Sequence, residues 1–408
     1  MPVIPIHQSL TNDAVITITI TSSRSMSDLY RSAINARLAK FPVPLPPPSD
    51  EDEGNEEDEA ADSIGTLPGS GMGPPAMPRR TLPITPAKTP NPLFSPISGS
   101  SFFDSASQVA VPSRGLDFRV YYTPPKYANG TIMICHHGAG YGGLSFACMA
   151  MEIKDLSKGE CGVLSPDARR HGKTVHLNQD EPEDENLSIE CLVADFCDLV
   201  QVMFPQPSKA PSLLLVGHSM GGSVMVRAVH LLLEKKYRIT GVVVLDVVEG
   251  SAIEALPHMH NLLNARPDGF DNIEEAVEWH ISTNTIRNSN SARVSIPSIF
   301  KHVPNTFKPY QWRTPLRSTA PYWTGWFAGL STTFLAARTA RLLLLAGTDR
   351  LDRELMIGQM QGKFQMEVIP GVGHMLQEDD PTRLAEILVD FWKRNERVVA
   401  GVKKVGEL

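Results

Sequence analysis

The stretch that most constrains the fold is Leu213-Leu-Leu-Val-Gly-His-Ser-Met-Gly-Gly222, in which four apolar residues lead into a serine flanked by glycines. The apolar run predicts a strand buried on both faces, and residues 221–235 have the pattern of a helix. The turn between them must be tight, so side chains at Gly217 or Gly221 would collide with a neighbouring strand or helix. The pattern therefore predicts an exposed Ser219 hydroxyl at a helix N-terminus, where the helix dipole stabilises negative charge.

Apolar runs alternate with helical stretches on both sides of this turn. Because continuous apolar strands are buried on both faces, the alternation predicts a mostly parallel, doubly wound α/β sheet. It breaks between Gly250 and about residue 333, and an insertion there would form a helical cap over the carboxyl ends of the strands. The expected strands are 118–122, 131–135, 162–165, 213–216, 241–245, 341–345 and 365–369, and the expected helices are 144–155, 189–203, 221–235, 273–281 and 381–394.

Residues 1–108 differ in composition from the rest of the chain. A proline run at 42–48 leads into the acidic tract 50–59, and a stretch rich in Gly, Pro, Ser and Thr follows. Such a segment buries too little apolar surface to offset its chain entropy, so it is predicted to be disordered, with the folded domain at 109–400. Its Ser-Pro and Thr-Pro pairs suit proline-directed kinases and ordinary linker turns equally well.

Composition excludes several classes of partner. The net charge of −7 argues against nucleic acid and acidic membrane surfaces, because both select basic patches. The odd count of five cysteines, without a Cys-x-x-Cys pair, argues against disulfides and structural zinc, and favours reduced, mostly buried thiols in a cytosolic or nuclear protein. No run of about 18 apolar residues occurs, and the first residues lack the pattern of a signal peptide, so neither a membrane span nor secretion is expected.

A serine hydroxyl is a weak nucleophile at neutral pH, so Ser219 requires a base and an acid that orients the base. In sheets with this turn the chain order is serine, acid, histidine, and His374 follows the last expected strand. Two residues compete for the role of the acid. Asp349 follows the penultimate strand, and Asp246 stands at the end of the strand that comes after the Ser219 turn and its helix. Both strand ends face one crevice, and position alone slightly favours Asp349.

Backbone N–H groups are expected to stabilise the oxyanion that forms during acyl transfer. One should belong to Met220, directly after the nucleophile, and the other to Ala139 in the loop His137-Gly-Ala-Gly140. The alternative for this loop is a dinucleotide cradle, but its spacing fails the Gly-x-Gly-x-x-Gly pattern. Acyl transfer by an activated serine requires neither an organic cofactor nor a metal, so neither is expected.

Seven stretches, spread over most of residues 115–392, carry a further signal: Gly217–Gly222, Leu245–Ser251, Ile286–Ser295, Tyr322–Ser331, Leu342–Asp352, Gly358–Met366 and Gly373-His374. Together they resemble the protein phosphatase methylesterases, a family of α/β-hydrolase fold. The resemblance implies hydrolysis of the methyl ester on the C-terminal leucine of the protein phosphatase 2A catalytic subunit. It also implies Ser219 as nucleophile, His374 as base and Asp246, rather than Asp349, as acid.

Two other functions remain open at this point. The fold alone would also suit a small-molecule esterase or lipase, which would hydrolyse long-chain esters well. A binding protein that inhibits the phosphatase, with catalysis secondary, is the alternative from a different class. The cap around Phe307–Ser318 is also shorter than in animal members of the family.

Overall fold

The computed structural model describes residues 88–178, 184–347 and 351–396. Within this part of the chain one sheet has nine strands, which lie side by side in the order β1 (Ser105–Val111), β2 (Leu116–Thr123), β4 (Cys161–Pro166), β3 (Thr131–His136), β6 (Ser212–His218), β7 (Ile239–Leu245), β11 (Ala340–Leu345) and β12 (Gln365–Val368), with β5 (Val175–His176) paired to β2. From β4 to β12 all neighbours are parallel, and β2 pairs antiparallel with β1, β4 and β5. The predicted mostly parallel sheet is confirmed.

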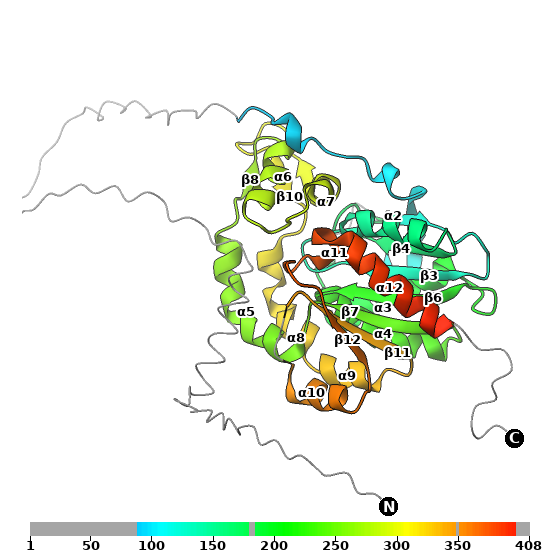
Figure 1. The fold of residues 1–408 in the computed structure, drawn as a ribbon. Helices are drawn as coiled ribbons and strands as arrows, with labels where there is room; N and C mark the ends of the chain where they lie inside the picture. The colour runs from blue at the N-terminus through cyan, green and yellow to red at the C-terminus, as the bar shows by residue number, and fades with distance from the viewer. Residues whose placement is uncertain (1–87, 179–183, 348–350, 397–408) are drawn as a thin grey trace, which may run out of the picture.

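Helices pack against the two faces of this sheet (Figure 1). The helices of the core are α2 (Ala147–Leu156), preceded by the short η4 (Gly143–Phe146), α3 (Ile189–Met203), α4 (Met220–Glu234), α10 (Arg353–Met360), α11 (Leu376–Asp379) and α12 (Pro381–Glu396). The pair α3 and α4 packs together, as do α2 and α12. The four helices expected in the core, at 144–155, 189–203, 221–235 and 381–394, are therefore present.

Strand β6 shows why an uninterrupted apolar run ends up in the centre of such a fold. Leu213 and Leu215 belong to one apolar cluster, whereas Leu214 and Val216 belong to the cluster on the other face. Successive side chains of a strand point to opposite faces, so a strand covered on both sides must be apolar at every position. Burying each of these side chains stabilises the fold by about 1.5–3 kcal/mol.

A cap is inserted between β7 and β11. Its elements are α5 (Glu249–Asn264), β8 (Gly269–Phe270), α6 (Ile273–Ser282), α7 (Ser289–Ser295), η5 (Ile296–Ile299), β9 (Phe300–His302), β10 (Tyr310–Trp312), η6 (Leu316–Tyr322), α8 (Trp323–Phe327) and α9 (Leu330–Ala336). In the described part of the cap β8, β10 and β9 form a small antiparallel sheet of their own. Figure 1 shows α6, α7 and this sheet beside one end of the core, with α5 and α8 along its edge.

Residues 88–108 differ from the sequence prediction of disorder up to residue 108. Strand β1 begins at Ser105 and pairs with β2 along its whole length. Further upstream, the Arg293 side chain of α7 donates a hydrogen bond from Nε to the Ser95 carbonyl oxygen, at 2.7 Å. Strand β1 is mostly exposed and so lacks an apolar run, and the Arg293–Ser95 contact joins residues 198 positions apart, so neither leaves a clear trace in local composition. Residues 1–87, the rest of the segment predicted to be disordered, lie outside the described part.

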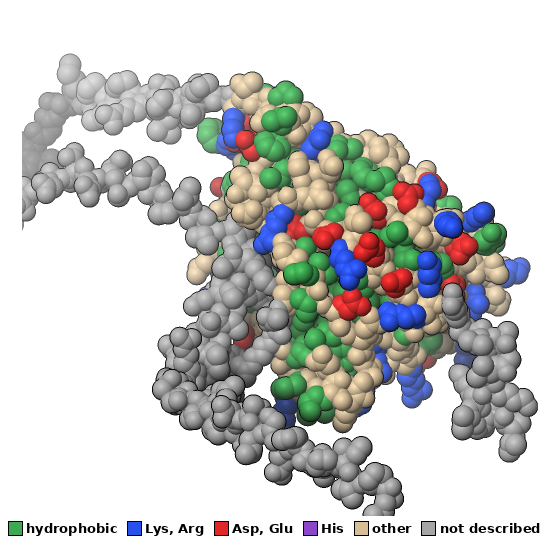
Figure 2. All heavy atoms as spheres, in the orientation of Figure 1, with side chains coloured by type: hydrophobic (Ala, Val, Ile, Leu, Met, Phe, Trp, Pro, Cys, Tyr) green, Lys and Arg blue, Asp and Glu red, His purple; other side chains and the backbone are tan. Residues whose placement is uncertain are grey.

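The surface and the cysteines agree with the expectations from composition. In Figure 2, basic and acidic side chains are interspersed over the face that carries α12 and α2. All five cysteines lie in the described residues and are free, four of them buried, which confirms mostly buried thiols. No helix in the described ranges is long and apolar enough to cross a membrane.

Candidate active site

Ser219 lies at the carboxyl end of β6, where the chain turns sharply into α4. Its backbone has φ +51° and ψ −120°, a conformation that a residue with a side chain adopts only under strain. A Cβ at Gly217 would lie 2.3 Å from the carbonyl oxygen of Gly221, and one at Gly221 would lie 2.2 Å from that of His136. Only glycine fits at both positions, which confirms the tight turn predicted from the sequence.

His374 and Asp246 are hydrogen-bonded to each other. The Nδ1–H of His374 donates to Oδ2 of Asp246 at 2.8 Å, and the carboxylate is almost completely buried. The other carboxylate oxygen, Oδ1, accepts from the backbone N–H of Ala346 at 2.8 Å. These two bonds fix the carboxylate and, through it, the orientation of the imidazole. The acid paired with His374 is thus the one that the resemblance implies, and Asp349 lies outside the described residues.

The loop that carries His374 is attached to the cap by Asp379. One oxygen of Asp379 accepts from the backbone N–H of Gly373 at 2.6 Å, and the other accepts from that of Arg287 at 2.8 Å. The Arg287 side chain returns to the same loop, where Nη1 donates to the carbonyl oxygen of Gly371. Burial raises the pKa of Asp379, and the N–H groups of Arg287 and Gly373 oppose that rise. Hydrogen bonds therefore join the cap directly to the His374 loop.

His218 is a member of the site to which the sequence assigned no role. Its Nε2–H donates to the backbone carbonyl oxygen of His374 at 2.8 Å, and the two rings have centroids 4.6 Å apart. Burial lowers the pKa of His218 to about 3, so the ring is neutral at physiological pH. Its position directly before Ser219 was the only signal in the sequence that could have pointed to it.

The two expected oxyanion donors lie near the nucleophile. Met220 is the first residue of α4, where backbone N–H groups have no acceptor within the helix. Ala139 follows β3 in the neighbouring loop, and both residues line the same pocket as Ser219. At Gly138 a Cβ would come within 3.2 Å of the Ser219 Cβ, which shows how closely the loop approaches the serine. The role of these two N–H groups stays a prediction.

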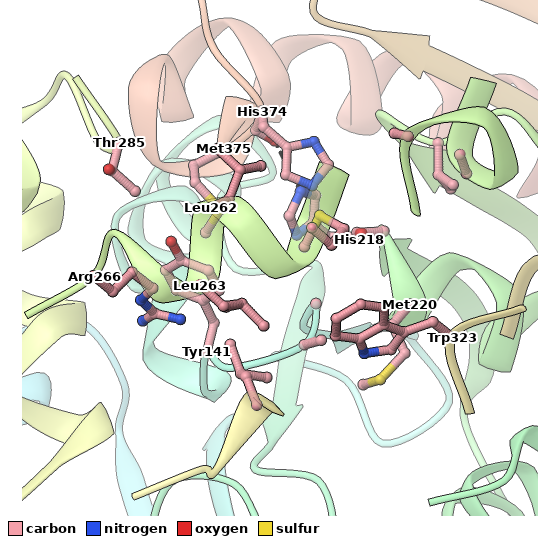
Figure 3. Close-up of a pocket in the computed structure, with 18 of the residues that line it drawn as sticks. Tyr141, His218, Met220, Leu262, Leu263, Arg266, Thr285, Trp323, His374 and Met375 are labelled. Atoms are coloured by element: carbon pink, nitrogen blue, oxygen red, sulfur yellow. Dashed lines mark hydrogen bonds between the residues drawn. The ribbon is translucent and has the colours of Figure 1, made fainter. Parts of the chain in front are cut away.

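Between the core and the cap lies a pocket of about 240 Å³ that is lined by Ser219 and His374. Figure 3 shows His374, His218 and Met220 among the residues around it. Its wall is mainly apolar and comes largely from α5 and α8 of the cap, through Leu256, Met259, Leu263, Trp323, Trp326 and Phe327. Arg266, just after α5, is a basic residue in the same wall. Among the described residues no group of three or more His, Cys, Asp or Glu side chains is arranged to hold a metal ion.

Comparisons with known proteins agree with this geometry. Residues 133–387 match the family described as the alpha/beta hydrolase family. A protein of Cryptococcus neoformans var. neoformans serotype D, named protein phosphatase methylesterase 1, is 43% identical over 417 residues, covering 93% of this chain and 96% of that protein. A protein of Emericella nidulans with the same name is 42% identical over 390 residues, covering 91% and 90%.

Solved structures are similar in fold at low sequence identity. E-2-(acetamidomethylene)succinate hydrolase superposes with a TM-score of 0.56 at 17% identity, covering 71% of this chain and 99% of that one. An esterase of Mycobacterium tuberculosis superposes with a TM-score of 0.52 at 18% identity, covering 71% and 92%. These structures and the family match show the α/β-hydrolase fold, and the two fungal proteins show the narrower family. The chain belongs to the protein phosphatase methylesterase family of α/β hydrolases.

Proposed function

We propose that this hydrolase is a serine esterase that removes the methyl ester from the C-terminal leucine of the protein phosphatase 2A catalytic subunit. The observation that carries the proposal is the His374–Asp246 pair, which lies beside the strained Ser219 turn in a pocket between core and cap. The names of the fungal relatives support the substrate class. Ser219, His374 and Asp246 then act as nucleophile, base and acid.

In the first step the Ser219 Oγ attacks the carbonyl carbon of the methyl ester, and His374 Nε2 takes the hydroxyl proton. Asp246 stabilises the imidazolium and keeps the proton on Nδ1. The negative charge on the former carbonyl oxygen is stabilised by the N–H groups of Met220 and Ala139. When the tetrahedral intermediate collapses, the bond to methoxide breaks and His374 returns the proton, so methanol leaves.

In the second step water attacks the acyl-enzyme, in which the carbonyl carbon of the substrate's last residue is bonded to Ser219. His374 takes a proton from the water and gives it to the departing Ser219 Oγ. The products are a free carboxylate and the regenerated enzyme. Every group in this sequence belongs to the chain, the ester or water.

The pocket has room for the apolar end of a peptide. A volume of about 240 Å³ accommodates an apolar side chain together with its ester group, and the wall around it is mainly apolar. Specificity for one protein must then come from surfaces outside the pocket, where the phosphatase would dock. Because the cap supplies most of the wall, we propose that the cap positions the methylated residue.

The decisive experiment measures methanol release from carboxymethylated phosphatase. Wild type should release it, and Ser219→Ala should be slower by several orders of magnitude, as other triads lead us to expect. Ser223→Ala is the matched control. Ser223 is a buried serine of α4, the helix that Ser219 precedes, and it does not line the pocket. If Ser219→Ala retained near-normal activity, the proposal would fail.

Two further measurements separate this function from its alternatives. A small-molecule esterase or lipase would turn over long-chain esters well and methylated phosphatase poorly, whereas we expect the reverse. If Ser219→Ala binds and inhibits the phosphatase as wild type does, the protein is a binding partner as well as an enzyme. The free, mostly buried cysteines are consistent with the cytosol or nucleus as the proposed compartment.

A further inference from the structure

Arg266 is a basic residue in the wall of the pocket, and it is held in a defined place. Its guanidinium carbon lies 3.6 Å from the centroid of the Trp312 ring, a close cation–π stack. The Trp312 ring is itself fixed, because its Nε1–H donates to the Pro267 carbonyl oxygen at 2.8 Å. Figure 3 shows Arg266 across Leu263 from Met220 and Trp323. The cation is therefore presented to the pocket at some remove from the nucleophile.

Within the described part of the chain the Arg266 guanidinium forms neither an ion pair nor a hydrogen bond, and no carboxylate acts on its pKa. Other arginines of the cap are partnered: Arg287 contacts Asp379, and Arg317 contacts Asp268. Burial lowers the pKa of Arg266 to about 10, which still leaves the side chain positively charged at neutral pH. A desolvated charge without a counter-charge is costly, and stacking on an aromatic ring offsets only part of that cost.

Tyr141 adds a second donor to the same pocket. Burial raises the pKa of its hydroxyl above the usual range, so the O–H stays protonated, and the positive charge of Arg266 acts on it in the opposite direction. The hydroxyl donates no hydrogen bond to another described residue. A guanidinium and a phenolic O–H, both without an acceptor, are the groups that recognise a carboxylate.

We propose that Arg266, assisted by Tyr141, binds a side-chain carboxylate that the substrate carries close to its methylated end. The reacting end itself is an uncharged ester, and its carboxylate product forms at Ser219, so neither explains a cation elsewhere in the pocket. An extended chain spans about 3.3 Å per residue, so a pocket of this size places the acidic residue within about three positions of the ester. This inference rests on the proposed methylesterase function and assigns its sequence preference.

The test uses short peptides of about six residues that end in leucine methyl ester. One peptide has Asn at each of the three positions before the leucine, and three others replace one Asn at a time by Asp. Wild type should cleave one of the Asp peptides with a kcat/KM roughly ten-fold or more above that of the Asn peptide, because a charge-assisted hydrogen bond contributes that much. The difference should appear mainly in KM.

Arg266→Gln should reduce this Asp-to-Asn preference to about one, and Arg266→Lys should retain part of it, because Lys keeps the charge but loses the planar stack. Lys301→Gln is the control for the loss of a cap charge, since Lys301 is exposed on β9 and does not line the pocket, and it should keep the full preference. Turnover of p-nitrophenyl acetate, a small neutral ester, should be the same in wild type and in the control variant, and it monitors the catalytic groups separately from the recognition of the peptide. Tyr141→Phe should lower the preference by a smaller factor.

Two results would overturn the inference. One is a wild type that cleaves Asp and Asn peptides equally at every position. The other is an Arg266→Gln variant that loses activity on both peptides and on p-nitrophenyl acetate alike, which would mark Arg266 as a structural residue. If wild type cleaved none of these short peptides, the proposed function would still be decided by methanol release from carboxymethylated phosphatase, which can dock outside the pocket. Binding of the same peptides to Ser219→Ala, measured by fluorescence anisotropy, would then still decide whether Arg266 selects the carboxylate.

Discussion

His218 donates a hydrogen bond from Nε2 to the backbone carbonyl oxygen of His374, at 2.8 Å. The residue beside the proposed nucleophile thus holds the backbone of the proposed base. The two positions are 156 residues apart in the chain, and they meet because β6 and the loop after β12 end at the same edge of the sheet. One buried, neutral imidazole therefore connects the two halves of the site.

Replacing His218 by Ala should weaken catalysis and stability together. The part-buried carbonyl oxygen of His374 would lose its donor, which costs about 1 kcal/mol in the free energy of unfolding. We expect kcat to fall by about ten-fold with little change in KM, because the base and not the pocket is displaced. His218→Gln is the matched variant, since its amide keeps an N–H donor and should retain most of the activity. Urea unfolding and methanol release measure the two effects, and equal losses in both variants would contradict this account.

The choice between two acids is decided by a pair of substitutions. Asp246→Asn should lower kcat/KM by about 10³–10⁴-fold, because the amide cannot hold the imidazole in the required tautomer or stabilise its charge. Asp349→Asn should cost far less. Both variants are compared in the methanol-release assay after circular dichroism has shown that they fold. A larger loss at Asp349 would mean that the pairing with Asp246 is not the catalytic one.

Ser219→Gly should make the protein more stable while it abolishes activity. A residue with a side chain at φ +51° and ψ −120° is strained by about 1–3 kcal/mol, and glycine adopts positive φ without that cost. Ser219→Ala removes the same hydroxyl but keeps the Cβ and therefore the strain. We expect a higher free energy of unfolding for Ser219→Gly than for Ser219→Ala, by about 1 kcal/mol. Equal stability of the two variants in urea would show that the turn is relaxed.

Acid should destabilise the fold through buried neutral histidines. Burial lowers the pKa of four of them to about 3 or 4 in the folded protein: His136, His171, His218 and His280. The unfolded chain takes up protons on them near pH 6.5, so the free energy of unfolding falls as the pH drops from about 6.5 to about 4. Each group contributes up to about 1.4 kcal/mol per pH unit in this window.

Three carboxyls act in the opposite direction, because burial raises the pKa of Asp167 to about 6, that of Glu378 well above its usual value, and that of Asp379 as well. The histidines outnumber them, so the net slope should remain positive with pH. Replacing His280 by Phe should flatten the dependence, since it removes one titrating group from the cap. Urea unfolding at several pH values from 4 to 7 measures the slope, and an unchanged slope in His280→Phe would contradict the assignment.

The local patterns predicted the core strands and helices well, because each of them depends on neighbouring residues. The uninterrupted run of β6 and the spacing of α3 are examples. Residues 88–108 were predicted wrongly because their order depends on contacts with other segments and not on their own residue pattern. Most of β1 is exposed, so it has neither an apolar run nor a clear alternation, and pairing with β2 orders it. The Ser95–Arg293 contact joins residues that are 198 positions apart in the chain.

The sequence by itself determined the turn at Ser219, the alternation of strands and helices and the place of the cap, since these follow from short-range sterics and hydrophobic periodicity. Only the tertiary structure brought Asp246 to His374 across 128 residues, placed His218 against the base and left Arg266 without a carboxylate partner among the described residues. Hydrogen-bond partners and unpaired charges depend on which strand ends and cap residues meet in space. A local sequence pattern does not contain this information, because the residues that meet are far apart in the chain.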